Sequence, residues 1–364
     1  MIDTTYLVGI MSGTSMDGVD TAMIAFSNQH SAGRLVECRF DAYPNALRQD
    51  LRALLSEGSN ELHRAAQLSI TLAEQYAASV RQLVADCGIQ PSAIACHGQT
   101  VRHRPDNGYS VQLLNPATLA ELTGTVVICD FRSRDIAAGG QGAPLVPAFH
   151  AKAFRHPQKN RVIVNIGGIA NLTWLPASGT IEGFDCGPGN LLLDHWCQQH
   201  TGHAFDRDGA WGAQGSVLPK LLARLLAHPY FYQSPPKSAG YEQFNPSWLT
   251  QQLQGNEQAQ DVQATLVALT AHGITNAILQ RYPTAHEVYL CGGGAHNHAL
   301  SRLIAQQLPQ QTVDDTGRLG ISPDWLEAHA FAWLGWQTLQ GQPGNQPEVT
   351  GARHTCVLGA IYPA

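Results

Sequence analysis

Glycine, serine and threonine residues gather with two aspartates near the start of the chain, in the run MSGTSMDGVD at Met11–Asp20. Glycines let a backbone approach phosphate closely, and hydroxyl and free N–H groups can donate hydrogen bonds to it. An aspartate among them can hold Mg2+, directly or through water, because this ion prefers oxygen ligands. The run is not a GxxxxGK[ST] loop, and it leads into a strand rather than a helix. It therefore predicts either a phosphate-binding turn or an ordinary hairpin turn.

A second run, GFDCGPGN at Gly183–Asn190, places one carboxylate beside a glycine-rich turn. A short strand would deliver Asp185 to this turn, and Asn190 could cap a helix that begins at Leu191. A carboxylate in such a place can act as a general base, which typically accelerates a reaction about 10²–10⁴-fold. The alternative is a turn aspartate that bonds its own backbone.

A third carboxylate stands in an apolar segment, SPDWLEAHAFAWL at Ser322–Leu334. Ser322 is typical of an N-cap and Pro323 of the first residue of a helix. A helix that is apolar nearly all round is expected to be buried, and a buried Glu327 needs a partner. Glu327 is then either a structural carboxylate paired with an arginine or a ligand for the hydroxyl groups of a substrate.

Two further polar residues lie at or after the ends of apolar segments that are typical of strands. His97 follows Ala93–Cys96, and Arg134 comes shortly after Val126–Cys129. Both side chains could face one cleft and contact a substrate there. The alternative is that each residue makes only a structural contact.

The remaining pattern indicates the elements that must position these residues. Strands are predicted at Tyr6–Ile10, Val19–Phe26, Arg161–Ile166, Asn171–Leu175 and Val288–Cys291. One long helix is predicted at residues 60–87. Three strands end in glycine-rich turns, near Gly13, Gly167 and Gly292. This spacing suits two related α/β halves with a nucleotide between them. Residues 229–246 form a long irregular loop, and such loops are often functional.

Composition narrows the classes of protein. The chain has 364 residues, of which 44% are hydrophobic and 14% charged, so two domains are expected. A net charge of -6 argues against nucleic acid or an anionic membrane as a partner, but not against ATP, whose phosphates backbone N–H groups can hold. No stretch approaches the roughly 18 apolar residues of a membrane helix. The eight cysteines form no CxxC pair and no secretion signal precedes them, so reduced thiols and a cytoplasmic location are expected.

Taken together and in order, the motifs resemble those of the anhydro-N-acetylmuramic acid kinase family, and the resemblance covers nearly the whole chain. Its segments are MSGTSMDGVD (11–20), HGQTVRH (97–103), DFRSRDIAAGGQGAPLVPAFH (130–150), NIGGIAN (165–171), FDCGPGN (184–190), FDRDGAWGAQG (205–215), PKSAGYEQFN (236–245), CGGGAHN (291–297) and the closing LGAIYPA.

The family belongs to the sugar kinase, heat-shock ATPase and actin superfamily. The resemblance therefore implies two actin-like, ribonuclease H-like α/β domains, each with a mixed sheet flanked by helices, and a nucleotide cleft between them. The expected first domain is 1–135 with 345–364, and the second is 136–344. Many superfamily members carry an aspartate in the second phosphate loop, where this sequence has Asn165 and Asn171.

The resemblance also assigns roles to residues, with ATP and Mg2+ as cofactors. Asp17 is the expected metal residue. The expected ATP-binding residues lie in three turns: Gly13, Thr14, Ser15, Met16, Asp17, Gly18, Val19 and Asp20; Gly167 and Gly168; and Gly292, Gly293 and Gly294.

The implied reaction opens the ether bridge of 1,6-anhydro-N-acetylmuramic acid, a product of cell-wall turnover, and phosphorylates O6. Asp185 is expected to deprotonate the water that attacks C1, and Glu327 to hold the sugar beside it. His97 and Arg134 are expected to bind the substrate, Arg134 through the lactyl carboxylate. A homodimer is implied as well. The alternatives are an ordinary hexose kinase of the same superfamily and a filament-forming actin relative.

Overall fold

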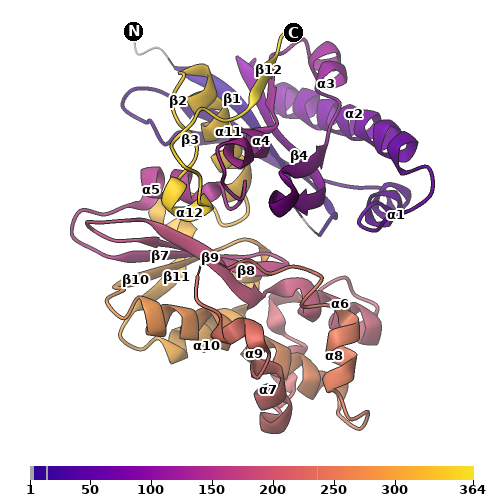
Figure 1. The fold of residues 1–364 in the computed structure, drawn as a ribbon, viewed down its shortest axis with the longest axis vertical. Coiled ribbons are helices and arrows are strands. Elements are labelled where there is room, and N and C mark those ends of the chain that lie inside the picture. Colours follow the sequence, from indigo (N-terminus) through magenta and orange to yellow (C-terminus); the bar gives the residue numbers. More distant parts are fainter. Residues whose placement is uncertain (1–3, 14, 236) are drawn as a thin grey trace. The chain divides into compact units, whose positions relative to one another are not determined.

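The computed structural model describes residues 4–13, 15–235 and 237–364, and it divides into two compact units (Figure 1). The first unit comprises Met1–Ala153 and Trp325–Ala364, and the second comprises Phe154–Asp324. These divisions differ from the expected ones at 135/136 and 344/345. The difference concerns mainly two helices, α5 (Val146–Phe154) and α11 (Leu326–Leu339), which the sequence assigned to the second domain.

The first unit is built on a mixed sheet. Its strands are β1 (Thr5–Ser12), β2 (Gly18–Phe26), β3 (Arg34–Ala42), β4 (Ala93–Arg104), β5 (Tyr109–Leu113), β6 (Val127–Cys129) and β12 (Ala360–Tyr362). Strands β1, β2 and β3 pair antiparallel, whereas β4 and β6 run parallel to β1. The order across the sheet is β12-β6-β4-β1-β2-β3, and β5 pairs with β4.

Helices cover both faces of this sheet. The helices of this unit are α1 (Asn45–Ala53), α2 (Glu61–Cys87), α3 (Pro116–Thr123), α4 (Phe131–Ala137), α5, α11 and α12 (Pro347–Thr350). Of these, α2 and α11 pack directly on the central strands. Alternate residues of β1 point to opposite faces: Val8 and Ile10 share an apolar core with α2, whereas a Cβ on Gly9 would lie 1.8 Å from the Ala328 carbonyl oxygen of α11. Only glycine allows α11 to lie this close to the strand, so α11 belongs to the first unit.

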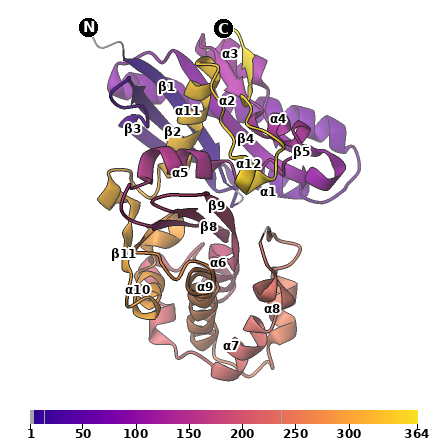
Figure 2. The same ribbon diagram turned by 60° about the vertical axis from the view of Figure 1, so that its left-hand side comes forward.

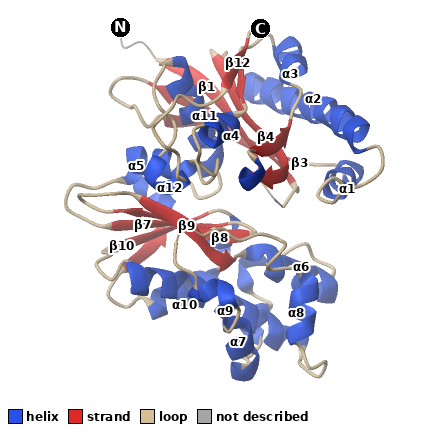
Figure 3. Ribbon diagram, viewed as in Figure 1, coloured by secondary structure: helices blue, strands red, loops and turns tan. Residues whose placement is uncertain are grey.

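The second unit repeats the same plan. Its strands are β7 (Arg161–Ile166), β8 (Ile169–Leu175), β9 (Glu182–Pro188), β10 (Glu287–Cys291) and β11 (Thr312–Asp315). Strands β7, β8 and β9 are antiparallel, β10 and β11 are parallel to β7, and the order is β11-β10-β7-β8-β9. Both units thus place an antiparallel meander beside two parallel strands, with helices on the sheets (Figure 3). The predicted actin-like α/β class is confirmed.

The helices of the second unit are α6 (Asn190–Thr201), α7 (Pro219–Leu226), α8 (Pro246–Gln252), α9 (Ala259–Arg281) and α10 (His298–Gln307). Helix α9 packs against α6, α7, α10 and β9 (Figure 2). In the described part of the chain, α9 is the one helix whose length and hydropathy would allow it to cross a membrane. Of its most apolar 18-residue stretch, 72% is buried inside the protein. The apolar character of α9 is therefore that of a core helix.

Short 3-10 helices lie in the connections, at Pro105–Asn107, Arg207–Gly209, Gly212–Gln214, Pro229–Tyr232, Gly293–His296 and Thr316–Leu319.

Two predicted helix starts are wrong. Helix α11 begins at Leu326 with Trp325 as N-cap, rather than at Ser322 and Pro323, because residues 323–325 form a turn in which the Pro323 carbonyl accepts a hydrogen bond from Gly292. Asn190 is the first residue of α6 and not its cap: its Nδ2 donates to the Ile166 carbonyl instead.

Candidate functional site

The turn between β1 and β2 holds the first group of predicted nucleotide-binding residues. Thr14 lies outside the described residues. Ser15 and Asp17 are exposed, and the Ser15 hydroxyl donates to Asp17 Oδ1 at 2.6 Å. Met16 is buried with a positive φ of 54°. At Gly13 the nearest atom to an added Cβ would be Ser15 Oγ at 3.8 Å, so the backbone is open to a ligand there.

The other three predicted residues of this run, Gly18, Val19 and Asp20, belong to strand β2. A Cβ on Gly18 would meet the Phe40 ring and the Asp41 carbonyl oxygen within 2.5 Å, so packing against β3 already requires glycine there. Val19 is 1% exposed, which leaves only its backbone for a ligand. The structure therefore concentrates the accessible polar groups of this run in the turn itself.

A buried hydrogen-bond network supports the turn from below. Gln99 of β4 is fully buried; its Nε2 donates to the Gly13 carbonyl at 3.1 Å, and its Oε1 accepts from the Ser12 hydroxyl at 2.5 Å. The Tyr43 hydroxyl donates to Ser12 Oγ at 2.9 Å and lies 3.1 Å from the Tyr76 hydroxyl. Burial raises the pKa of both tyrosines, so they stay neutral donors. Gln99 lies in the motif HGQTVRH (97–103), but nothing in the sequence indicates its contact with Gly13.

His97 lies inside β4, which continues to Arg104, and not beyond the end of a strand as predicted. Its Nε2 receives two N–H groups of Arg132, Nη2 at 2.8 Å and Nε at 3.1 Å. Nε2 must therefore accept, so the ring proton is on Nδ1, which donates to the Gly98 carbonyl at 2.8 Å. Burial, aided by Arg132, lowers the pKa of His97 well below its usual value. Both ring nitrogens are occupied by the protein.

Arg132, which is hydrogen-bonded to His97, also interacts electrostatically with Glu327, the predicted carboxylate on α11. Its Nη1 also donates to the Gly142 carbonyl at 2.7 Å, and burial lowers its pKa to about 10, so it remains a cation near neutral pH. Burial raises the pKa of Glu327, while the nearby Arg132 opposes that rise. The expectation that Glu327 would need a charged partner identified the right type of residue, but sequence reasoning did not select Arg132.

Arg134, the other predicted substrate residue of this unit, lies two positions further along α4 and is exposed. Its side chain interacts with the Cys356 thiol, and its backbone carbonyl accepts from the Ala138 N–H. Arg134 therefore presents a cation at the surface, unlike Arg132.

In the second unit, two glycine turns meet at the ends of β7 and β10. Gly167 and Gly168 connect β7 to β8, and their carbonyls accept from the backbone N–H groups of residues 189–191 at the start of α6. Gly292 has φ 74°, and a Cβ there would lie 2.3 Å from Asn165 Oδ1. A Cβ on Gly294 would meet Ile166 at 2.2 Å, whereas Gly293 is open. The structure thus brings Gly167, Gly168 and Gly292–Gly294 together, and their role in nucleotide binding stays a prediction.

Asp185 lies on β9, beside the Gly167–Gly168 turn. Asn171 of β8 pairs with Asp185 and Ala170 pairs with Gly187, so the extra residue, Cys186, forms a bulge. Bulges re-aim neighbouring side chains and are common beside active sites. The carboxylate Oδ2 accepts from the Ala239 backbone N–H at 2.9 Å, and the Tyr230 hydroxyl donates to the Asp185 carbonyl at 2.7 Å. No described residue donates a hydrogen bond to Oδ1.

The surroundings of Asp185 change its proton affinity. Burial raises the pKa of its carboxyl group to about 6, and Glu242 adds to the rise, whereas the Ala239 N–H and Lys237 oppose it. A carboxylate with a pKa near the working pH and one unoccupied oxygen has the properties of a general base.

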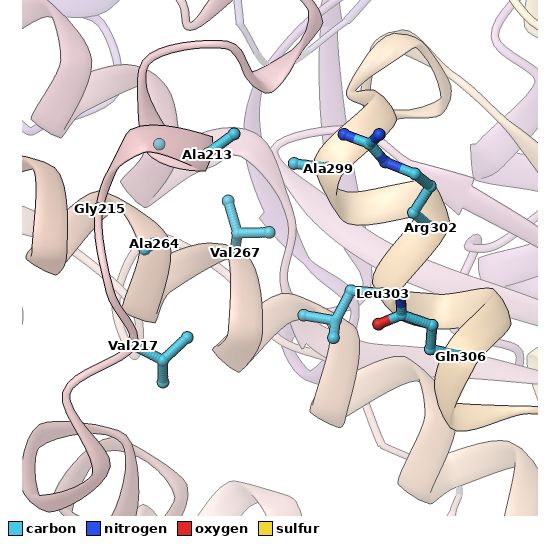
Figure 4. A pocket seen from close by; sticks show the side chains of 10 residues that line it. Ala213, Gly215, Val217, Ala264, Val267, Ala299, Arg302, Leu303 and Gln306 are labelled. Carbon is cyan, nitrogen blue, oxygen red and sulfur yellow. The ribbon is translucent and has the colours of Figure 1, made fainter.

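A surface hollow in the second unit lies apart from these residues (Figure 4). Ala213 and Val217 of the loop before α7, Val267 of α9, and Ala299, Arg302 and Leu303 of α10 line it. None of the predicted site residues is among its lining residues.

Two sheets of this order, each with a glycine-rich hairpin turn after its first antiparallel strand, are those of the actin-like α/β class. The model of the family described as anhydro-N-acetylmuramic acid kinase matches residues 5–364. The chain belongs to the anhydro-N-acetylmuramic acid kinase family.

Individual relatives agree over the full length. An anhydro-N-acetylmuramic acid kinase of Nitrosomonas europaea is 53% identical over 364 residues, covering 99% of this chain and 100% of the relative. A protein of the same name from Pseudomonas putida is 48% identical, covering 98% of this chain and 99% of its own length.

Solved structures of low sequence identity are also similar to this chain. They include the ADPNP-bound activator of a 2-hydroxyisocaproyl-CoA dehydratase from Clostridium difficile, with a TM-score of 0.47 and 12% identity, over 92% of this chain and 96% of that one. A glucokinase of the ROK family from Streptomyces griseus has a TM-score of 0.41 and 12% identity, over 90% of this chain and 99% of that one.

Proposed function

We propose that this chain is an ATP- and Mg2+-dependent kinase that hydrolytically opens 1,6-anhydro-N-acetylmuramic acid and yields N-acetylmuramate 6-phosphate and ADP. Full-length membership of the kinase family supports the substrate and the peptidoglycan-recycling role. The single structural observation behind the proposed chemistry is Asp185, a carboxylate with a pKa near 6 and an unoccupied Oδ1.

The proposed reaction balances as follows. Water attacks C1 and gives a proton to Asp185, while the bond from C1 to the bridging O6 breaks. O6 then forms a bond to the γ-phosphorus of ATP, and the bond between that phosphorus and the β,γ-bridging oxygen breaks to release ADP. Asp185 serves water rather than a sugar hydroxyl, and this distinguishes the reaction from that of an ordinary hexose kinase.

Residues of the first unit are proposed to bind the substrates. Arg134 offers an exposed guanidinium for the lactyl carboxylate. Glu327 would accept hydrogen bonds from the sugar hydroxyls, with Arg132 favouring its ionised form. Because the Nδ1 and Nε2 atoms of His97 are both engaged, His97 would act by holding Arg132 rather than by direct contact through a ring nitrogen.

The turn Gly13–Asp17 fits the proposed phosphate and metal role. Asp17 is exposed, and only its Oδ1 is engaged, by Ser15. Mg2+ commonly binds to one or two carboxylates and to substrate phosphates while keeping several waters. Asp17 would hold the ion directly or through water, and the ion would neutralise phosphate charge during transfer.

We also propose a cytoplasmic location and a homodimer, as family membership suggests. All eight cysteines are free thiols, and most are buried, which suits a reducing compartment.

The proposed function is tested by measuring ADP formation with purified protein, ATP, Mg2+ and a candidate sugar. We expect turnover with the anhydro-sugar and none when Mg2+ or the sugar is left out. Equal or faster turnover with glucose or N-acetylglucosamine would favour an ordinary hexose kinase instead. ATP-dependent polymerisation without sugar phosphorylation would favour a filament-forming actin relative.

A further inference from the structure

The segment Lys237–Ala239 lies directly against Asp185, although it is about fifty residues further along the chain. The Ala239 N–H donates to Asp185 Oδ2, and the Asp185 N–H donates to the Lys237 carbonyl at 3.4 Å. The Tyr230 hydroxyl, from the same connection between α7 and α8, donates to the Asp185 carbonyl. The backbone N–H, the backbone carbonyl and one carboxylate oxygen of Asp185 are thus all engaged by this connection.

The Lys237 side chain contacts two residues that adjoin Asp185, Tyr230 and Phe184. Its Nζ donates to the Tyr230 carbonyl at 3.2 Å and lies 4.6 Å from the centre of the Tyr230 ring and 5.7 Å from that of Phe184. Ammonium groups are attracted to aromatic faces, and more strongly where they are desolvated. Phe184 precedes Asp185 in β9, and the Tyr230 hydroxyl donates to the Asp185 backbone carbonyl. The ammonium group therefore contacts two residues that are next to Asp185.

Lys237 is also the cation that acts on this carboxylate within the described part of the chain. Glu242 adds a negative charge nearby, which works in the opposite direction. The other titratable neighbours are Cys186 and Tyr230, and burial raises the pKa of both, so they are neutral near pH 7. Without Lys237, burial and Glu242 would act on Asp185 with only the Ala239 N–H to oppose them.

We propose that Lys237 is a positioning residue for Asp185: it holds the segment Lys237–Ala239 on the carboxylate, keeps that group ionised, and leaves Oδ1 to receive the proton of the attacking water. The proposal rests on the function proposed above, because it assumes that Asp185 is the base. Lys237 itself need not touch the sugar or ATP.

The test is the pH profile of kcat/KM for the anhydro-sugar, measured for the wild type and three variants. The wild type should lose activity below about pH 6, because the pKa of Asp185 is about 6 and the protonated acid cannot accept a proton. Lys237→Met keeps the length without the charge and should raise this midpoint by about one unit, the lower end for losing a nearby opposite charge. Well below the midpoint, this shift lowers activity about tenfold.

Two matched variants serve as controls. Lys237→Arg keeps a cation for the two aromatic rings and should restore most of the wild-type midpoint. Lys220→Met removes an exposed lysine of α7 in the same unit and should leave the profile unchanged. An equal loss at all pH values in Lys237→Met, or an unchanged profile, would overturn the proposal by showing that the charge does not act on the base.

A second measurement does not depend on turnover. The pKa of Asp185 can be followed by NMR in free protein with 13C-labelled aspartate carboxyl groups, assigned with Asp185→Asn. Lys237→Met should raise it, and an unchanged value would overturn the proposal. If the wild type fails to phosphorylate the anhydro-sugar while this shift appears, the proposed function is wrong but the coupling between Lys237 and Asp185 stands.

Discussion

The hairpin turn between the first two strands of each sheet is built differently in the two units. In the first unit, side chains shape the turn: Gln99 holds Gly13, Ser15 binds Asp17, and the carboxylate of Asp17 is exposed. In the second unit, the turn is Gly167–Gly168, and backbone groups at the start of α6 occupy its carbonyls. One sheet order thus supports one turn that presents a carboxylate and another that presents none.

In the second unit, the acid near the glycine turn lies on neither of the two strands that flank this turn. Asn165 and Asn171 occupy the strands that flank Gly167–Gly168, and the carboxylate closest along the sheet is Asp185, opposite Asn171 on β9. The comparison suggests a division of work in which the first turn serves the metal and phosphates and the second unit supplies the base. Three substitutions test this division, in order of decreasing expected effect.

The largest effect is expected from Asp185→Asn, which keeps the shape of the side chain but cannot accept a proton from water. Loss of a general base typically lowers kcat by about 10²–10⁴-fold, or roughly 3–5 kcal/mol of barrier. Binding of ATP and sugar, measured by calorimetry, should stay close to that of the wild type, because the lost interaction belongs to the transition state. Near-normal turnover would show that the base lies elsewhere.

An intermediate effect is expected from Asp17→Asn. If Asp17 serves Mg2+, activity should fall about 10–100-fold, the range typical for losing a supporting group of a metal site, and more Mg2+ should be needed for half-maximal rate. The thermal midpoint should change little because the side chain is exposed. Wild-type Mg2+ dependence in this variant would show that Asp17 does not serve the metal and that the turn is an ordinary hairpin.

The smallest effect on turnover, and the clearest effect on stability, is expected from Gln99→Leu. This change removes the buried hydrogen bonds that Gln99 makes to the Ser12 hydroxyl and to the Gly13 carbonyl, while Ser12 Oγ keeps the Gly18 carbonyl as an acceptor. The loss should lower the free energy of unfolding by about 1–3 kcal/mol. Denaturant titration measures this loss. KM for ATP should rise while KM for the sugar stays constant, and a change confined to the sugar would contradict the role of Gln99 beneath the turn.

Local pattern was enough to predict several strands of each sheet, but not β3, β5, β11 or β12. Alternating and β-branched runs located β1, β2, β7, β8 and β10 to within a few residues, and the glycines after them located the turns. These features depend on neighbouring residues, which is why one sequence could reveal them. The helix predicted for residues 60–87 is likewise found as α2, at Glu61–Cys87.

Contacts between distant residues were not predictable in the same way. The pairing of Arg132 with His97 requires β4 and the start of α4 to be neighbours, and the engagement of Asp185 by Ala239 requires the 229–245 connection to fold back on β9. The predicted start of α11 was wrong for the same reason, because the Pro323 carbonyl accepts a hydrogen bond from the Gly292 N–H and not from a residue of the helix. Assigning α11 to its unit needed the close approach to Gly9, which no periodicity encodes.

The central claim is that Asp185 activates water, and the origin of one oxygen atom tests it most directly. The reaction is run in heavy-oxygen water with ATP, Mg2+ and the anhydro-sugar, and the product is analysed at once by mass spectrometry with fragmentation. Ring opening by water should place one label at C1 and none in the ester link at C6. An unlabelled C1 in freshly formed product would contradict the mechanism, even if the protein proved to be a sugar kinase.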